Sequence, residues 1–470
     1  MSFETSDATL SALGDFPSQD TSLLDCIVIG AGPAGSASST VLAQARRSVL
    51  CLEAEEFPRF HIGESMLPAA VRIWKRLGLW EKLQPLGFPY KGGADFVTAD
   101  NKDIAHFWFG DWLEEDLKDA IQVDRAKFDK AAVDHARSCG ADVRYGCRVT
   151  DVKLMNPGVE VTWRDPAGAS HTGCAHALLD CSGIKSFMGK RLGLRRTIDS
   201  LTKFAVFAHY DDVKLPEGIR EGIITVVCAA DAWYWVIPLE IHGRHNRTSV
   251  GCVIDRKVRD HWRGEPADLL DHLIEASVHL RERMTRAKRV SPVRVEADYS
   301  NRCDPSHGES WSLVGDAAAF LDPIFSTGFC LSQRHAIISA EAIDGAIRKR
   351  GCVRAADFAG PSREFFQSVD TYTRFVRGFY ERPAWLDCFM SPPVNQFNVR
   401  RAVVRVLAGD VHRVSFWLAV FFLFVRLQRW FPLVPRVSRP RVTDGLVSGG
   451  EGGRGVSGKA KAGFADAGTR

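Results

Sequence analysis

The sequence lacks the cysteine spacing, the charge imbalance and the N-terminal signal that mark several protein classes. None of its 12 cysteines stands in a CxxC pair, so neither a zinc cage nor a dithiol redox couple is indicated, and we expect no metal site. Lys and Arg number 61 against 57 Asp and Glu, and this near balance argues against nucleic acid as a partner. Residues 1–20 carry acidic, Ser and Thr residues where a secretion signal needs a basic segment and an apolar core. We therefore expect a cytoplasmic protein with reduced, buried cysteines.

The sequence also lacks a hydrophobic run long enough to cross a bilayer. The most apolar segment, residues 414–425 (VSFWLAVFFLFV), is shorter than the roughly 20 residues that a spanning helix needs. We expect it to form a buried helix or a lid over an apolar pocket. Peripheral contact with a membrane surface is the alternative.

What the chain does have is enough length and apolar content for a large enzyme. Its 470 residues, 45% of them hydrophobic, suit one large α/β unit or two merged domains. Residues 1–23 have the composition of a flexible leader, and the Gly-rich, polar end of the chain, residues 441–470, is expected to be disordered.

A βαβ unit with a glycine fingerprint begins the ordered chain. The β-branched run from Asp25 ends at Gly30 and is followed by Ala31-Gly-Pro-Ala-Gly35, a helical stretch to Arg47 and a second strand that ends at Glu53. This GxGxxG spacing permits a tight turn and brings helix N-terminal amides close to a pyrophosphate, while the acidic residue meets a ribose. The pattern predicts dinucleotide binding.

Later segments return to the same domain. A strand at 177–180 and another at 310–316 that ends in Gly315-Asp316 predict a discontinuous fold, in which the Asp316 carboxylate reaches a ribityl or ribose hydroxyl. These segments predict an α/β fold with a Rossmann-like dinucleotide-binding domain, an inserted β-sheet substrate layer and a helical C-terminal region. This architecture resembles the FAD-binding domain of the p-hydroxybenzoate hydroxylase type. We expect the FAD-binding domain at 24–345, its β-rich insertion at approximately 85–120 and 200–290, and the helical region, a candidate lid, at 346–440.

Four stretches together resemble the flavin-dependent halogenases, in particular the branch that acts on phenol, pyrrole or carrier-bound aromatic rings. They span most of residues 25–340 and comprise Gly30–Gly35, Phe57-Pro-Arg-Phe-His-Ile-Gly-Glu-Ser65 with Leu67-Pro68, Trp233-x-Trp235-x-Ile237-Pro238, and Phe320-x-x-Pro323-x-x-Ser326-x-Gly328 directly after Gly315-Asp316.

The resemblance implies a specific chemistry. A halogenase uses FADH2, O2 and chloride or bromide to form hypohalous acid, which is passed to a lysine for electrophilic halogenation of an electron-rich ring in natural-product biosynthesis. No second GxGxxG is present, so a separate NAD(P)H-dependent flavin reductase is an expected partner. The substrate is expected to be a small aromatic molecule, free or tethered to an acyl or peptidyl carrier protein.

The family's catalytic lysine corresponds to Lys91, which lies between aromatic residues and next to Gly92-Gly93. Any single lysine is most often a solvated surface residue. The flanking aromatic residues and the close approach that Gly92-Gly93 allows favour a pocket instead. The amine would either form a haloamine or hydrogen-bond to hypohalous acid, and the sequence does not decide between the two. The halide would lie at Ser326, Thr327 and Gly328, although such a loop can equally be a turn without a ligand.

The resemblance also assigns the cofactor contacts and a wall. Trp233, Trp235, Ile237 and Pro238 would separate flavin from substrate, although alternate aromatics on a strand are also typical of a core. The FAD contacts would be Gly30, Gly32, Ala34, Gly35, Glu53, Arg59, Ile62, Gly63, Glu64, Ser65, Arg125, Asp316 and Gly328.

Departures from the family patterns narrow the interpretation. Tryptophan halogenases carry a glutamate where this chain has Phe325, which argues against free tryptophan as substrate. An FAD-dependent aromatic monooxygenase and a geranylgeranyl-type reductase of the same fold remain alternatives, as does a flavin-binding protein without catalysis. The stretch Asp180-Cys-Ser-Gly183 departs from the Asp-Gly signature common in the monooxygenases.

Overall fold

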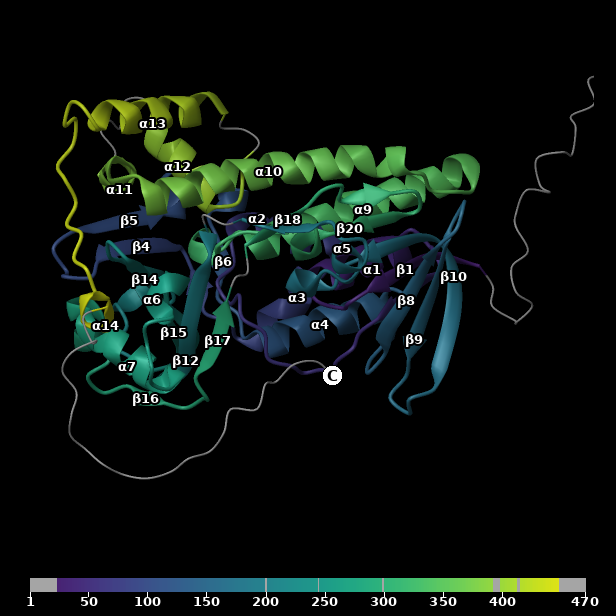
Figure 1. The fold of residues 1–470 in the computed structure, drawn as a ribbon, viewed down its shortest axis with the longest axis horizontal. Helices are drawn as coiled ribbons and strands as arrows, with labels where there is room; N and C mark the ends of the chain where they lie inside the picture. Colours follow the sequence, from purple (N-terminus) through teal and green to yellow (C-terminus); the bar gives the residue numbers. More distant parts are fainter. Residues whose placement is uncertain are drawn as a thin grey trace, which may run out of the picture.

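The computed structural model describes residues 23–198, 201–243, 245–297, 300–391, 398–411 and 415–447. Within them, two eight-stranded sheets lie on opposite sides of the molecule, and the long helices α9 (Gly328–Arg350) and α10 (Ala355–Glu381) run along one edge (Figure 1). Residues 1–22 of the predicted leader (1–23) and residues 448–470 of the predicted tail (441–470) lie outside the described residues, and the domain division stays a prediction.

The first sheet is the dinucleotide-binding sheet. Its order is β19-β20-β10-β1-β2-β7, parallel from β20 to β7, with the β8–β9 hairpin attached to β10. This arrangement confirms that the strand near Gly315 returns to the βαβ unit. The strands are β1 (Leu24–Ile29), β2 (Val49–Leu52), β7 (Asp142–Arg144), β8 (Arg148–Leu154), β9 (Val159–Arg164), β10 (Ser170–Asp180), β19 (His307–Gly308) and β20 (Trp311–Leu313).

Helices α1 (Pro33–Gln44), α4 (Arg125–Ser138) and α9 share a hydrophobic cluster with one face of this sheet. Cys26 and Val28 of β1 point into that cluster, whereas Ile27 and Ile29 belong to the cluster on the opposite face, as the two-residue period requires. The side chain of Asp124 caps α4 by accepting a hydrogen bond from the Ala126 amide at 2.8 Å.

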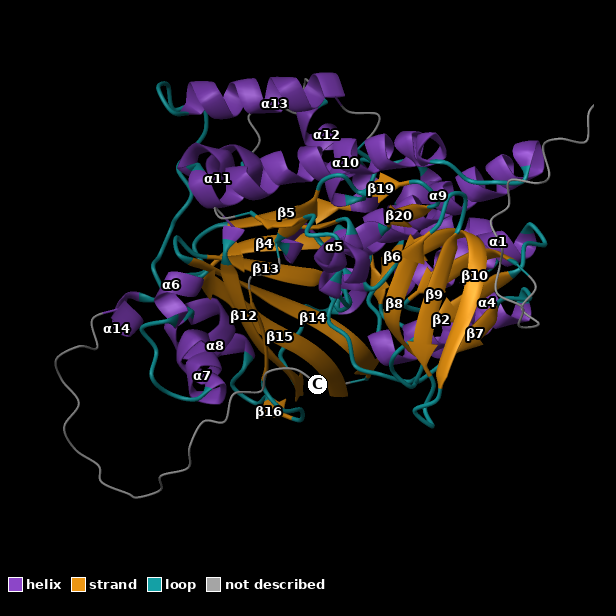
Figure 2. Ribbon diagram, turned by 45° about the vertical axis from the view of Figure 1, so that its right-hand side comes forward, coloured by secondary structure: helices purple, strands orange, loops and turns teal. Residues whose placement is uncertain are grey.

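The second sheet has the order β16-β12-β15-β14-β13-β4-β5, with β17 paired to β12. Its strands, shown in orange in Figure 2, come from the two regions in which we expected inserted strands and extend as far as Ala297. They are β4 (Gly93–Thr98), β5 (Ile104–Trp108), β12 (Lys203–Asp211), β13 (Ile224–Cys228), β14 (Ala232–His242), β15 (His245–Asp255), β16 (Lys288–Arg289) and β17 (Arg294–Ala297).

Shorter elements join the two sheets. Two small sheets are formed by β3 (Tyr90–Lys91) with β6 (Ala120–Ile121), and by β11 (Arg195–Thr197), β18 (Asn301–Cys303) and β21 (Ala319–Phe320). The other helices of the first 300 residues are α2 (Pro68–Leu77), α3 (Trp80–Leu83), α5 (Phe187–Arg191), α6 (Arg256–Arg259), α7 (Pro266–Ala276) and α8 (Val278–Arg283).

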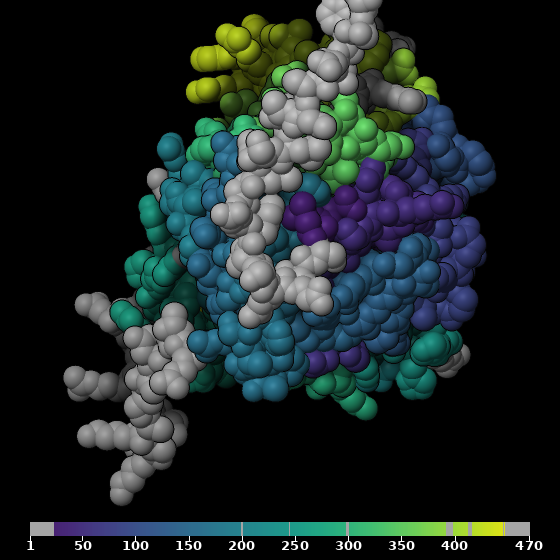
Figure 3. All heavy atoms as spheres, turned by 90° about the vertical axis from the view of Figure 1, so that its right-hand side faces the viewer, coloured from purple at the N-terminus to yellow at the C-terminus, as the bar shows by residue number. Residues whose placement is uncertain are grey.

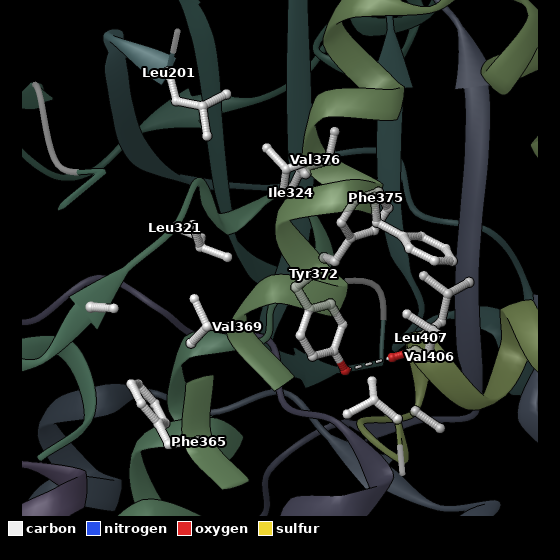
Figure 4. Close-up of a cluster of buried hydrophobic side chains, with 14 of the residues drawn as sticks. Leu201, Leu321, Ile324, Phe365, Val369, Tyr372, Phe375, Val376, Val406 and Leu407 are labelled. Carbon is white, nitrogen blue, oxygen red and sulfur yellow. Dashed lines mark hydrogen bonds between the residues drawn. The ribbon is translucent and has the colours of Figure 1, made fainter. Parts of the chain in front are cut away.

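The C-terminal region is helical, as predicted. Helices α11 (Pro383–Met390), α12 (Val399–Leu407) and α13 (Ser415–Gln428) form a layer beyond α10, and a buried apolar cluster joins α10 to α12, where the Tyr372 hydroxyl donates to the Val406 carbonyl at 2.8 Å (Figure 4). A space-filling view shows this yellow-green region at one end of the molecule (Figure 3). No helix in the described segments is long and apolar enough to cross a membrane.

Two expectations about this region are corrected. The apolar segment at 414–425 is not a wholly buried helix: Leu418, Phe421 and Val425 of α13 are buried, but the opposite side is exposed, with Phe416 70% exposed. Residues 441–447 are not part of a disordered tail, since α14 (Asp444–Val447) forms there and the Thr443 hydroxyl donates to the Asp231 carboxylate.

Candidate active site

The glycine turn after β1 has the close packing that its motif predicts. A Cβ on Gly35 would lie 1.8 Å from the Gly30 carbonyl oxygen, and one on Gly30, whose φ is +89°, would lie 2.7 Å from the Cys181 carbonyl oxygen. A Cβ on Gly32 would meet only the Arg59 guanidinium, at 3.6 Å. The first and third glycines therefore serve packing, while the second leaves the N-terminus of α1 open to a ligand.

Glu53 and Arg59 lie beside this turn. The buried Glu53 carboxylate accepts a hydrogen bond from the Ala31 amide at 2.8 Å, and an Arg59 nitrogen lies 3.7 Å from it. The Nε of Arg59 is buried and has no hydrogen-bond partner in the described structure. This Nε lies 3.7 Å from a Glu55 carboxylate oxygen, beyond hydrogen-bond distance, and an unused guanidinium donor at the turn fits the pyrophosphate of a dinucleotide.

Arg125 fixes the segment that carries Ile62 and Gly63. Its guanidinium forms a bidentate ion pair with Asp129 one helical turn on, with both N–O distances 2.9 Å, and donates to the Ile62 carbonyl at 2.8 Å. Arg59 also approaches Asp129, at 3.7 Å. The neighbouring His61 is exposed, and its Nδ1 lies 2.7 Å from the Ile62 carbonyl oxygen and 3.5 Å from an Arg125 nitrogen.

Lys91 is buried against the same segment. Only 2% of its surface is exposed, and its Nζ donates to the Ser65 hydroxyl at 2.8 Å and to the Met66 carbonyl at 2.7 Å. The contact arises because Lys91 on β3 pairs with β6, and Ser65 in turn bridges to Gln122 just after β6. Burial lowers the pKa of Lys91 to about 7. The structure thus brings the predicted catalytic lysine, Lys91, into contact with Ser65 of the Gly-Glu-Ser stretch, 26 positions earlier in the sequence.

Glu64 points the other way, toward the second sheet. Its Oε1 lies 2.8 Å from the Nε2 of His209 on β12, while its Oε2 is buried without a hydrogen-bond partner in the described residues. The His209 contact ties the Gly-Glu-Ser stretch to the second sheet.

Asp316 follows β20, as predicted. Burial raises the pKa of its carboxyl to about 6, and the Ser332 hydroxyl, which donates to it at 2.9 Å, and the charge of Arg125 only partly offset that effect. A Cβ on Gly328 would lie 3.5 Å from the same carboxylate. The predicted ribityl contact and the predicted halide loop are therefore neighbours.

The halide loop leads directly into a long helix. A short 3-10 helix (Pro323–Phe325) precedes Ser326, which has a φ of +55°, and α9 begins at Gly328. Thr327 is buried and occupies the N-cap position, but its side chain does not cap the helix. Asp316, Thr327 and Gly328 line a small cavity beside the first turn of α9.

The tryptophan strand connects these parts. Trp233, Trp235 and Ile237 are buried on one face of β14, with the two indole rings 5.7 Å apart, and Pro238 follows at a bulge. Trp235 packs on Phe207, whose ring lies 6.3 Å from Phe60 in the segment before Ile62. Trp233, Trp235 and Ile237 are therefore part of the hydrophobic core, in the cluster that residues of both large sheets share.

Trp233 reaches the halide loop through a C-terminal helix. Its Nε1 donates to the Tyr380 hydroxyl at 2.7 Å, and that hydroxyl donates to the Asp322 carboxylate at 2.9 Å. Asp322 also accepts from the Ile324 amide and so fixes the turn that precedes Ser326. The Tyr380 side chain of α10 thus hydrogen-bonds both to Trp233 of the predicted wall and to Asp322, which precedes the predicted halide loop.

Four residues of this site were missed by sequence reasoning: Asp129, His209, Asp322 and Tyr380. Asp129 stands four positions after Arg125 on a helix, and this ion-pair spacing could have revealed it. Asp322 lies inside the Phe320-x-x-Pro323 stretch and could have been noted. No sequence signal links His209 or Tyr380 to the motifs that they contact.

The residues present fit FAD on three observations. Gly32 leaves room for a close approach, the Arg59 Nε is a buried donor without a hydrogen-bond partner among the described residues, and Asp316 is a half-buried carboxylate able to accept hydrogen bonds from ribityl hydroxyls.

Comparison with known proteins places the chain in a family. Residues 24–351 match the FAD binding domain family. The chain is 31% identical over 410 residues to the flavin-dependent halogenase armH4 of Armillaria mellea, with 80% of this chain and 75% of that protein covered. It is 28% identical over 416 residues to a 1H-pyrrole-2-carbonyl-[peptidyl-carrier protein] chlorinase of Pseudomonas fluorescens, with 83% and 89% covered.

The fold agrees with the sequence comparison. The structure of the flavin-dependent brominase Bmp2 superimposes with a TM-score of 0.77 at 28% identity, covering 87% of this chain and 99% of that one. The chain is an FAD-binding oxidoreductase, and it belongs to the flavin-dependent halogenases, on the phenol and pyrrole branch. The predicted fold class, family and cofactor are confirmed, and the monooxygenase and reductase alternatives are disfavoured.

Proposed function

We propose that Lys91 is the residue that presents the halogen to an electron-rich aromatic ring. The observation that carries this proposal is the position of its amine, buried and bound to two acceptors, Ser65 and Met66. A neutral amine has two N–H groups, so these bonds use both and leave the lone pair free. With a pKa of about 7, a large fraction of Lys91 is neutral at physiological pH.

The reaction would have two balanced steps. Bound FAD, in its reduced form, supplies the two electrons with which O2 and a halide yield hypohalous acid and water. The Lys91 amine then loses a proton and gains the halogen from hypohalous acid, releasing water, and it regains a proton when the ring carbon takes the halogen. Alternatively, the ammonium form hydrogen-bonds to hypohalous acid and polarises it.

We propose the halide site at Ser326, Thr327 and Gly328. The support is the cavity beside the first turn of α9, where backbone amides and the helix dipole favour an anion. Trp233 and Trp235, held by Tyr380 and by the Ser249 hydroxyl, would form the wall that keeps the organic substrate from the flavin.

The substrate class follows from the relatives. The matched chlorinase acts on a pyrrole carried by a peptidyl carrier protein, and we propose a pyrrole or phenol ring, carrier-bound, as substrate here. We also propose a separate flavin reductase as partner, because this chain has one dinucleotide fingerprint.

The test compares Lys91→Ala, Lys91→Arg and Lys82→Ala, the last an exposed lysine that binds Ser138. The enzyme is supplied with FAD, a flavin reductase, NADH, bromide and a panel of free and carrier-bound pyrroles and phenols. Both Lys91 variants should bind FAD and consume oxygen but give no brominated product, since a guanidinium offers no free lone pair, while Lys82→Ala should behave as wild type. Normal bromination by Lys91→Ala would exclude the proposed role.

The halide site has its own test. Gly328→Val fills the space toward Asp316 and Phe320 and should raise the halide concentration needed for half-maximal product, with FAD still bound. Gly345→Val lies on the same helix, and a Cβ there meets nothing within 4 Å, so it is the matched control. Unchanged halide dependence in Gly328→Val would place the halide elsewhere.

A further inference from the structure

Helix α13 has an apolar outer side that the fold does not use. Its inner side packs on α11 and α12 through Leu418, Phe421 and Val425, and the Phe421 ring stacks on Phe375 at 5.9 Å. In Figures 1 and 2 the helix is the outermost element of this end of the molecule. These contacts bury the inner side of α13. Its outer side has no packing partner among the described residues.

The outer side forms a row, which we call the apolar ridge. Phe416, Leu423 and Leu427 recur at spacings of seven and four residues and so share one side of α13, and Trp430 lies two residues beyond the end of the helix. Phe416 and Trp430 are each 70% exposed, Leu423 is 54% exposed, and the adjoining Phe431 is 66% exposed. Soluble surfaces seldom expose so many large apolar side chains together, and such a patch marks an interaction site.

The charge around the apolar ridge has one sign. Residues 411–440 contain five arginines and no aspartate or glutamate. Arg426, Arg429 and Arg436 are exposed, and none of the three forms an ion pair within the described residues, in contrast to Arg401, which pairs with Glu114. No ion pair holds these three arginines, and the Arg429 guanidinium lies over the Trp430 ring, 5.4 Å from its centre, so all three can meet an anionic surface beside the apolar ridge.

We propose that the apolar ridge and its arginines dock the enzyme on an anionic membrane surface. The 14-residue helix presents a straight row about 20 Å long, which suits a flat lipid interface better than a concave protein groove. Trp, Phe and Leu enter the headgroup boundary while arginines pair with phosphate, as in interfacial helices. This inference concerns where the enzyme works and is independent of the proposed chemistry.

The experiment is sedimentation of the full chain with vesicles of phosphatidylcholine alone, or with phosphatidylglycerol as about a third of the lipid. Wild type should bind the anionic vesicles and bind the neutral ones much more weakly. Trp430→Ser combined with Phe431→Ser should reduce binding at least about tenfold. Arg429→Gln combined with Arg436→Gln should reduce it about thirtyfold, since each arginine near such a surface contributes roughly fivefold.

The matched control is Ile219→Ser, which removes an equally exposed apolar side chain, 71% exposed, far from α13 in the sequence. It should bind as wild type, and all variants should bind FAD normally. Failure of wild type to bind anionic vesicles would overturn the proposal, as would equal binding by the Trp430 and Phe431 variant. The proposal would also be overturned if wild type formed a dimer that the Trp430 and Phe431 double variant could not form. The same holds if this variant lost binding to a carrier protein while keeping its binding to lipid, because the apolar ridge would then contact a protein partner.

Discussion

Replacing Lys91 by Met should change how the stability of the protein depends on pH. Burial lowers the pKa of this lysine from its ordinary value of 10.5 to about 7 in the folded state. The unfolded chain therefore binds more protons than the folded chain between these two values, and wild-type stability is lost as pH falls through that window. Below pH 7 both states are protonated, and the loss is complete and constant.

The size of the effect follows from the shift. At about 1.4 kcal/mol per pKa unit, the full window corresponds to roughly 5 kcal/mol, and the part between pH 7 and pH 9 to about 2 kcal/mol. Lys91→Met keeps most of the side-chain volume and removes the titration, so it should be more stable than wild type at pH 7, and this advantage should shrink toward pH 9.

Calorimetry of both proteins at several pH values between 7 and 9 gives this difference directly. The comparison isolates Lys91, because every other titrating group is common to the two proteins. A constant difference between wild type and Lys91→Met across this range would show that Lys91 titrates normally, and the argument for a neutral amine in the pocket would fail.

Three further predictions concern the cofactor and the wall. Gly35→Ala should abolish folding because its Cβ would overlap the Gly30 carbonyl, whereas Gly32→Ala should fold and only weaken FAD binding, as flavin fluorescence titration would show. Tyr380→Phe should cost about 1–2 kcal/mol of stability and release more peroxide per product, measured by a peroxidase-coupled assay, since it loses its hydrogen bonds to Trp233 and Asp322. FAD should bind more tightly as pH rises through about 6, because ribityl hydroxyls favour the ionised Asp316; Asp316→Asn should abolish this dependence, and a retained dependence would assign it to another group.

The local parts of the fold could be predicted from the sequence because their signals are local. The βαβ unit carries its strand period, its glycines and its acidic residue within 30 positions. The N-cap at Asp124 and the inward alternation of Trp233 and Trp235 are of the same kind. Each depends on backbone geometry that neighbouring residues decide.

The contacts between distant segments could not be predicted in this way. Lys91 meets Ser65 only because two very short strands pair and a loop bridges to one of them, and neither strand has enough residues for a period to be visible. Tyr380 reaches Trp233 from a helix 147 positions away. The apolar segment near residue 420 was read as buried, because composition alone does not tell which side of an apolar helix finds a partner.

The two buried lysines of the site region show why Lys91 stands out. Lys203 is 5% exposed, but its amine pairs with Asp255 at 3.0 Å and lies 3.9 Å from the centre of the Tyr380 ring. Lys91 is more deeply buried and has no acidic partner in the described structure, only a hydroxyl and a carbonyl. An apolar side chain of similar length would fill the same space without the cost of burying an amine. A fold that pairs one buried lysine and leaves the other without an acidic partner beside the Gly-Glu-Ser stretch keeps Lys91 partly neutral, which is the form that the proposed haloamine route would use.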